Sequence, residues 1–129
     1  MKHIEVVAAL TIREDSVLVA QRQKGEFAGM WEFPGGKIES GETHEQALQR
    51  EILEELSLPI SVDQFFMTIN YQYPSFHLTM HCYICTALQP KFENLEHSEV
   101  RFVQFRDLPN MNWIPADVEV VEKLLKKKG

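Results

Sequence analysis

The chain has 129 residues, enough for one domain with a buried core. Its 44% of apolar and 25% of charged residues are typical of a globular protein and exclude a fibrous or low-complexity chain. No apolar run reaches the roughly 20 residues that a membrane-spanning helix needs, and the first residues lack the layout of a secretory signal. We expect one cytoplasmic domain over residues 1–129 with no membrane partner.

The formal net charge of −6 bears on the class of partner. Binding to a nucleic-acid polymer requires clustered lysine and arginine, so we expect no polymer partner. An acidic protein still binds a small phosphorylated molecule when a metal ion lies between the charges. For the protein itself we expect a monomer or a weak dimer.

The first third of the chain alternates strands and turns. Residues 4–12 and 17–22 are rich in β-branched and small apolar side chains and flank the polar turn Arg13–Ser16, which predicts a β-hairpin. A short strand is predicted at 31–33. It ends at Pro34–Lys37, whose proline and two glycines predict a loop.

A helix with a defined start follows this loop. Thr43 fits the N-cap position of a capping box, in which the side chain of Gln46 reaches back to the cap. The helix is predicted to end before Pro59, because proline disfavours a helical residue before it. One face carries a buried apolar stripe, formed by Leu48, Ile52 and Leu56.

The rest of the chain is mostly extended. Strands are predicted near 62–66, 67–73, 77–86 and 101–105, and a final helix at about 116–128. One helix inside a run of strands and one at the end indicate a mixed β-sheet covered by helices on both faces.

The two cysteines lie in the predicted strand 77–86. Cys82 and Cys85 are three residues apart, so in a strand their thiols point to opposite faces and cannot form a disulfide with each other. A zinc site would need a second pair of ligands of this type, which the sequence lacks. We expect reduced cysteines within the sheet.

Three carboxylates lie on one side of the first predicted helix. Glu51, Glu54 and Glu55 share a face, on an arc beside the apolar stripe. Like charges at this spacing destabilise a bare helix by roughly 0.2–0.5 kcal/mol per pair, and a divalent cation would offset that repulsion. Clustered carboxylate oxygens are the ligands that Mg²⁺ prefers. The arc is free to line a cleft, which predicts a divalent-cation site.

The spacing of these residues from an upstream glycine is specific. Gly36 is followed after five residues by Glu42, and after seven more by Arg50-Glu51-Ile52-Leu53-Glu54-Glu55-Leu56-Ser57-Leu58. This resembles the Nudix box, G-x5-E-x7-R-E-U-x-E-E-x-G-U, where U is a bulky aliphatic residue. Ser57 stands where the family has glycine, so we expect a strained or altered turn there, with the chemistry retained.

The resemblance extends to the MutT-like and CTP pyrophosphohydrolase-like branch of the family, through residues 4–9, 20–22, 31–37 and 114–117. It implies an α+β fold, the Nudix α/β/α sandwich with a mixed β-sheet between helices. It also implies Mg²⁺-dependent hydrolysis of a (deoxy)nucleoside triphosphate to monophosphate and pyrophosphate, with Mn²⁺ as a substitute. Three alternatives stay open: an 8-oxo-dGTP diphosphatase that cleans the nucleotide pool, a CTP or modified-dCTP pyrophosphohydrolase, and a non-catalytic nucleotide-binding module.

The resemblance implies roles for individual residues. It assigns metal ligands to the Gly35 carbonyl and to the carboxylates of Glu51, Glu54, Glu55 and Glu99. It assigns catalysis to Glu51, Glu54 and Glu99. It assigns substrate contacts to Arg22, Glu32, Phe33, Pro34, Lys37 and Asp117. Arg50 is implied to be structural, pairing with a helix carboxylate and holding it in place.

Two compatible roles stay open for Asp117, the N-cap of the final helix and, by resemblance, a contact to the nucleotide base. An ionised carboxylate only accepts hydrogen bonds. Guanine, with adjacent N1–H and N2–H donors, and cytosine, with its N4–H donor, would then fit better than thymine or uracil. Phe76 lies near a position where a MutT-type enzyme can place an arginine, which leaves the base preference open.

Overall fold

The sheet is built around β1 (Lys2–Arg13) in a computed structural model that describes residues 1–128. The other strands are β2 (Ser16–Gln21), β3 (Trp31–Glu32), β4 (Gly35–Lys37), β5 (Ile60–Gln72), β6 (Phe76–Ala87) and β7 (Glu99–Gln104). β1 pairs in parallel with β6, antiparallel with β4 along its middle, and antiparallel with β2 at its end, where the expected hairpin forms. β5 pairs with β6, and β3 and β7 pair with β2.

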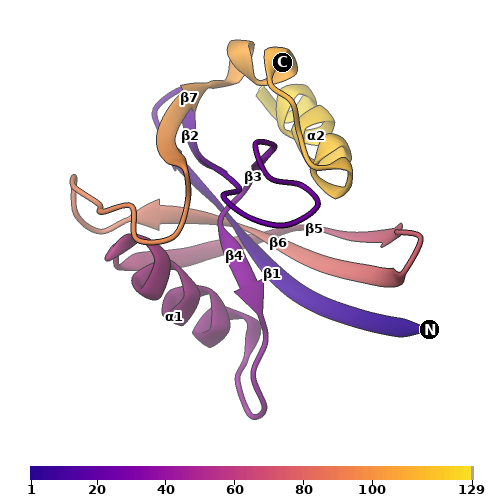
Figure 1. Cartoon of the computed structure of the whole chain (residues 1–129). Coiled ribbons are helices and arrows are strands. Elements are labelled where there is room, and N and C mark those ends of the chain that lie inside the picture. The colour runs from indigo at the N-terminus through magenta and orange to yellow at the C-terminus, as the bar shows by residue number, and fades with distance from the viewer. Residues whose placement is uncertain (129) are drawn as a thin grey trace.

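Helices cover both faces of this mixed sheet (Figure 1). α1 (His44–Leu56) packs on one face, and α2 (Val118–Lys128) lies on the other with the 3-10 segments η1 (Phe105–Asn110) and η2 (Pro115–Asp117). The sheet has one hydrophobic core on each face, and alternate residues of β1 point into them. Val7 packs in the core under α1 and Ala8 in the core under α2. The expected α/β/α sandwich is confirmed.

The start of α1 follows its sequence signature. The Thr43 hydroxyl accepts a hydrogen bond from the Gln46 N–H at 3.1 Å, and the Gln46 side chain accepts one from the Thr43 N–H at 2.9 Å. Both halves of the predicted capping box are therefore present. The apolar stripe of α1 is fully buried, which fixes the direction in which the remaining faces of the helix point.

Two expectations about strands were wrong. The segments 62–66 and 67–73 form one strand, β5, whose pairing with β6 shifts register between Val62 and Gln64 and between Phe65 and Met67. These irregularities break the alternation of side chains, and so the sequence pattern suggested two strands. Gly35–Lys37, expected as a loop, is the strand β4 and pairs with Val6–Ala8.

Glycine allows β4 to lie so close to β1. A Cβ atom on Gly35 would lie 1.9 Å from the Val7 carbonyl oxygen, so no other residue fits without moving the backbone. The glycine in Pro34–Lys37, which suggested a loop, therefore allows β4 to lie close to β1.

The cysteines lie where strand geometry predicted. Cys82 and Cys85 are both free and buried, the first in the core under α2 and the second in the core under α1. None of the helices described here is both long and apolar enough to cross a bilayer.

Ser57, the C-cap of α1, has the left-handed backbone that the missing glycine would favour, with φ of 52° and ψ of 36°. A side chain with a Cβ is strained in this region. We expect Ser57→Gly to raise the free energy of unfolding by about 0.5–1 kcal/mol and to leave turnover unchanged, as measured by urea unfolding. Ser57→Ala is the control, because it keeps the Cβ and should give no such gain. A less stable glycine variant would contradict the strain.

Candidate active site

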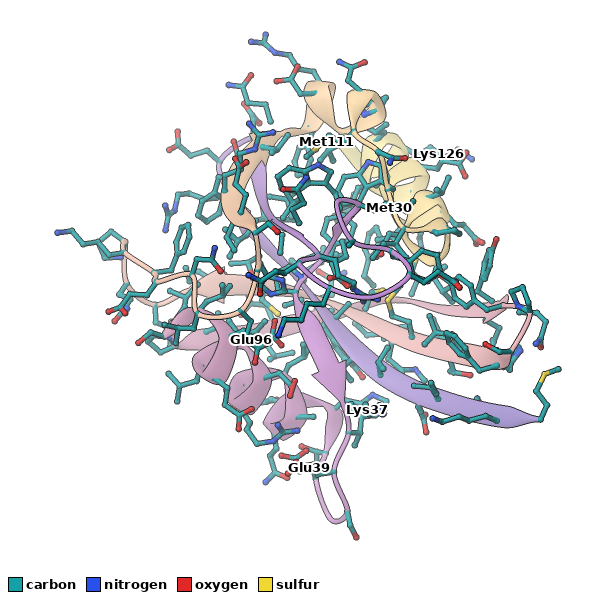
Figure 2. The ribbon with its side chains drawn as sticks, viewed as in Figure 1. Met30, Lys37, Glu39, Glu96, Met111 and Lys126 are labelled. Carbon is teal, nitrogen blue, oxygen red and sulfur yellow. The ribbon has the colours of Figure 1, made fainter. Side chains whose placement is uncertain are left out.

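A polar cavity of about 530 Å³ opens between the end of α1, β4 and the loop that precedes β7. Glu55 projects into it from α1, Gly35 forms part of its floor from β4, and Arg22 lies at its rim. Figure 2 shows Glu96 on the loop near the end of α1, at the same cavity. Residues of α1, which carries the carboxylates, and of β4, which carries the glycines, therefore line one cavity, as the spacing of the two motifs in the sequence suggested.

Glu55 and Glu51 form the acidic centre of this region. The Glu55 side chain is only 5% exposed, and burial, with the neighbouring charge of Glu51, raises its pKa to about 7 even though a hydrogen bond from His97 opposes the shift. Burial also raises the pKa of Glu51, against the opposing hydrogen bond from Arg50. A cation bound close to both carboxylates would favour their ionised forms.

Gly36 makes room for Glu51. A Cβ at position 36 would lie 1.9 Å from Glu51 Oε2, so the carboxylate occupies the space that any other side chain would fill. The two glycines of β4 are therefore required for different contacts. Gly35 allows β1 to lie close to β4, and Gly36 leaves room for the Glu51 carboxylate.

Arg50 joins the acidic residues into one network, as expected. Its guanidinium donates to Glu42 at 2.6 and 2.9 Å, to Glu51 at 3.0 Å and to Glu54 at 3.4 Å, and to the Lys37 carbonyl at 3.0 Å. The hydrogen bonds from Arg50 and from the Glu39 N–H lower the pKa of Glu42 to about 2. Arg50 thereby ties the carboxylate face of α1 to the strand that carries the glycines.

The other two acids assigned by resemblance lie further out. The side chain of Glu54 is 57% exposed and contacts Arg50. The side chain of Glu99, at the start of β7, is 50% exposed and pairs with Arg101 at 3.2 Å. Glu99 is not part of the cavity lining, whereas Glu96 and His97 of the preceding loop are.

The residues present fit a divalent cation. Glu55 and Gly35 line the same cavity, where a carboxylate and a backbone carbonyl are the oxygen donors that they have to offer, and the charge of Glu51 acts on Glu55. All are hard oxygen donors of the kind that Mg²⁺ and Mn²⁺ prefer. Burial raises the pKa of both Glu55 and the half-buried Glu51, so a bound cation would favour the ionised form of each.

A second, more apolar cavity of about 260 Å³ adjoins the first and shares Arg22, Glu32 and Gly35 with it. Aromatic rings form part of its wall: Tyr73 contacts Phe27 at 5.3 Å and Phe76 at 4.9 Å between ring centroids. A polar cavity for charged groups is thus continuous with an aromatic one suited to a planar ring.

Asp117 lies at this second cavity and is not an N-cap. The helical run begins at Pro115 with Ile114 as its cap, so Asp117 is already inside the run. Its side chain is buried, and within residues 1–128 its Oδ1 has no hydrogen-bond partner. Burial and the charge of Glu32 raise its pKa well above the usual range, against the opposing effects of Arg22 and of the Phe33 N–H.

Of the remaining substrate contacts expected by resemblance, all but Pro34 line at least one of the two cavities. Arg22 and Glu32 form a two-pronged ion pair, with Arg22 Nε 3.0 Å from Glu32 Oε2, at the junction of the cavities. Phe33 is buried, stacks on Trp113 and lines the second cavity. Lys37 is exposed at the edge of that cavity (Figure 2). Pro34 is buried and lines neither cavity; its carbonyl accepts a hydrogen bond from the Ala9 N–H.

Among the cavity residues that the sequence did not reveal are two with titratable side chains beside Glu55, Glu96 and His97. They lie in a loop, where no periodicity predicts the direction of a side chain, and the resemblance assigned a role only to Glu99 in this stretch. A second unforeseen cluster, formed by Glu5, His44 and His81, lies away from the cavity. Its two imidazole rings are stacked 4.3 Å apart with 23° between their planes, and its ligand atoms lie within 4.8 Å of one another.

The fold and the site together define the class of protein: an α/β/α sandwich in which a carboxylate-bearing helix faces a glycine strand. Comparison with known proteins agrees with this class. The NUDIX domain family matches residues 1–124, and the chain belongs to this family.

Named relatives match along nearly the whole chain. The CTP pyrophosphohydrolase of Escherichia coli is 31% identical over 126 residues, which cover 97% of this chain and 93% of that protein. The 8-oxo-dGTP diphosphatase of Haemophilus influenzae is 31% identical over 129 residues, covering 98% and 95%. The solution structure of the E. coli ORF135 protein aligns with a TM-score of 0.85 and 30% identity, covering 100% of this chain and 93% of that one. The protein is accordingly a hydrolase of the Nudix type.

Proposed function

We propose that the protein hydrolyses nucleoside triphosphates to the monophosphate and pyrophosphate with Mg²⁺, and that guanine or cytosine nucleotides are its substrates. The observation that carries this proposal is the junction of the two cavities. The polar cavity is lined by Glu55 of the carboxylate helix, and the adjoining aromatic cavity is lined by Asp117. The relatives named for 8-oxo-dGTP and for CTP hydrolysis support the same substrate class.

The residues divide the work between phosphate and base. When bound, Mg²⁺ would withdraw charge from the phosphates and make an attacking water more acidic. Glu55, Glu51 and the Gly35 carbonyl would hold it, with Glu54 and Glu99 as the further acids expected by resemblance. Arg22 lies at the junction of the cavities, where it would contact a phosphate group when its ion pair with Glu32 opens. Catalysis then depends on positioning and electrostatics.

Asp117 sets the base preference through its protonation state. Its raised pKa favours the neutral carboxyl in the free protein, which donates one hydrogen bond and accepts another. That form fits the N4–H and N3 of cytosine, but it fits the N3–H and O4 of uracil or thymine as well. The ionised form fits the adjacent N1–H and N2–H donors of guanine and excludes uracil and thymine. Two adjacent N–H donors on the ligand stabilise the ionised carboxylate in the complex, so guanine is the base that Asp117 discriminates best.

We expect Asp117→Ala to narrow the preference for guanine nucleotides, including 8-oxoguanine, over thymidine and uridine nucleotides by about tenfold, the effect of one lost hydrogen-bond pair. The melting temperature should change little, because the variant removes a carboxyl with an unpaired oxygen. Asp117→Asn is the matched control: the amide keeps the shape and mimics the neutral carboxyl. The test is to measure kcat/KM for the guanine, cytosine, thymine and uracil nucleotides on the wild type, Asp117→Ala and Asp117→Asn. An unchanged ranking in Asp117→Ala would remove this residue from the base site.

A panel of nucleoside triphosphates incubated with Mg²⁺, with products separated by anion exchange, tests the proposed function. Monophosphate and pyrophosphate are the expected products. A protein that binds guanine or cytosine nucleotides without turning over any member of the panel would be the non-catalytic binding module instead. Preferred hydrolysis of a nucleotide sugar would move the protein to another substrate class of the family.

A further inference from the structure

The loop between β6 and β7 is fastened to the end of α1 (Figure 1). The Glu93 N–H donates to the Leu56 carbonyl at 2.8 Å and the Leu95 N–H to the Glu55 carbonyl at 3.0 Å. Carbonyls at a helix C-terminus have no partner within the helix, so the loop supplies the donors that α1 needs. At its other end the Ser98 N–H donates to Gln21 of β2 at 3.0 Å. The loop therefore has a fixed position over the polar cavity.

One side chain holds His97 within this loop. Asn94 Oδ1 accepts from the His97 N–H at 2.8 Å, and Asn94 Nδ2 donates to the His97 carbonyl at 2.6 Å. Both backbone polar groups of His97 are thus engaged by the same amide. The backbone of the histidine is fixed relative to the end of α1.

The imidazole held in this way contacts the central carboxylate of the cavity. His97 Nε2 lies 2.9 Å from Glu55 Oε1, and the two side chains are 10% and 5% exposed. The contact engages one oxygen of Glu55 and leaves Oε2 without a contact to the imidazole. A carboxylate with one oxygen held by a buried donor has little freedom to rotate.

We propose that His97 is a positioning residue for metal binding: held by Asn94, it fixes the Glu55 carboxylate so that the carboxylate binds the divalent cation. The inference rests on the proposed function, because it takes Glu55 as a metal ligand. Outer-shell partners of this kind typically change metal affinity by about 10–100-fold when removed. Glu99, which resemblance offers as the contribution of this loop, does not contact Glu55; His97 does.

The test measures Mn²⁺ binding without nucleotide, from the electron paramagnetic resonance signal of free Mn²⁺ at pH 8. We expect His97→Ala to raise the Kd for Mn²⁺ by about 10–100-fold and Asn94→Ala to raise it by a smaller factor. His97→Gln should recover most of the affinity, because its amide can donate to Glu55. Glu93→Gln is the matched control, which removes an exposed negative charge from the same loop and should leave the Kd unchanged. The nucleotide KM at saturating metal should stay within about threefold in His97→Ala, since His97 acts on the metal.

The outcomes separate this inference from the proposed function. If Glu55→Gln weakens Mn²⁺ binding but His97→Ala and Asn94→Ala bind as the wild type does, Glu55 remains a metal ligand and the role of His97 is refuted. Nitrogen hyperfine coupling from His97 in the Mn²⁺ spectrum would also refute it, because the imidazole would then be a direct ligand. If the wild type and Glu55→Gln bind Mn²⁺ equally, the metal site of the proposed function fails, and this inference fails with it.

Discussion

Glu55→Gln is expected to lower kcat/KM by at least about 10²–10³-fold, the cost of one lost electrostatic contact at a reacting centre. Glu55 is the most buried carboxylate of α1, and it lines the polar cavity together with Gly35. The amide keeps the shape of the side chain and removes the negative charge that a cation requires. Steady-state kinetics with a guanine nucleotide and Mg²⁺ measure the effect.

The fold should survive this substitution. Glutamine still accepts a hydrogen bond from His97, and removing the charge relieves the repulsion with Glu51. Glu45→Gln is the matched control, since it makes the same change at an exposed position of the same helix and should leave the rate within about twofold. A Glu55→Gln protein with near-normal kcat/KM would show that the cation is bound elsewhere.

Removal of divalent cations is expected to abolish turnover. Glu51 and Glu55 repel each other in a partly dehydrated region, and a triphosphate adds further negative charge, so the substrate would meet unfavourable charge without a cation. Excess chelator should reduce pyrophosphate release to background, and Mg²⁺ or Mn²⁺, both suited to oxygen ligands, should restore it.

A chelator control distinguishes loss of catalysis from loss of fold. Circular dichroism with and without chelator should be the same, because α1 is held by its buried stripe and by Arg50 without any ion. Full turnover in excess chelator would contradict a metal mechanism. Unfolding in chelator would instead assign the ion a structural role.

The start of α1 and its buried stripe could be predicted because their signals are local, whereas the role of Arg50 was implied by resemblance. A capping box and a four-residue repeat depend on neighbours in the sequence, and the structure confirms both. The turn at Ser57 was also predictable, since a residue in place of glycine must adopt the same left-handed backbone.

Long-range features could not be predicted in this way. β4 exists because Gly35 meets Val7 across the sheet, and no neighbour of Gly35 in the sequence indicates that contact. β5 appeared as two strands because its irregular register is set by β6. Asp117 suggested an N-cap from its place before an apolar run, but the helical segment starts two residues earlier at Pro115. The position of His97 depends on how a loop packs against α1, which sequence spacing does not encode.

Metal-dependent hydrolysis of a nucleoside triphosphate at Glu55 is tested most directly by a product analysis of 8-oxo-dGTP, dGTP and CTP with Mg²⁺ in ¹⁸O-labelled water, run on the wild type and on Glu55→Gln. We expect a monophosphate and pyrophosphate in equal amounts from at least one of these nucleotides, with turnover lost in chelator and strongly reduced in Glu55→Gln. Release of orthophosphate and a diphosphate, or a rate that neither chelator nor the substitution affects, would contradict it.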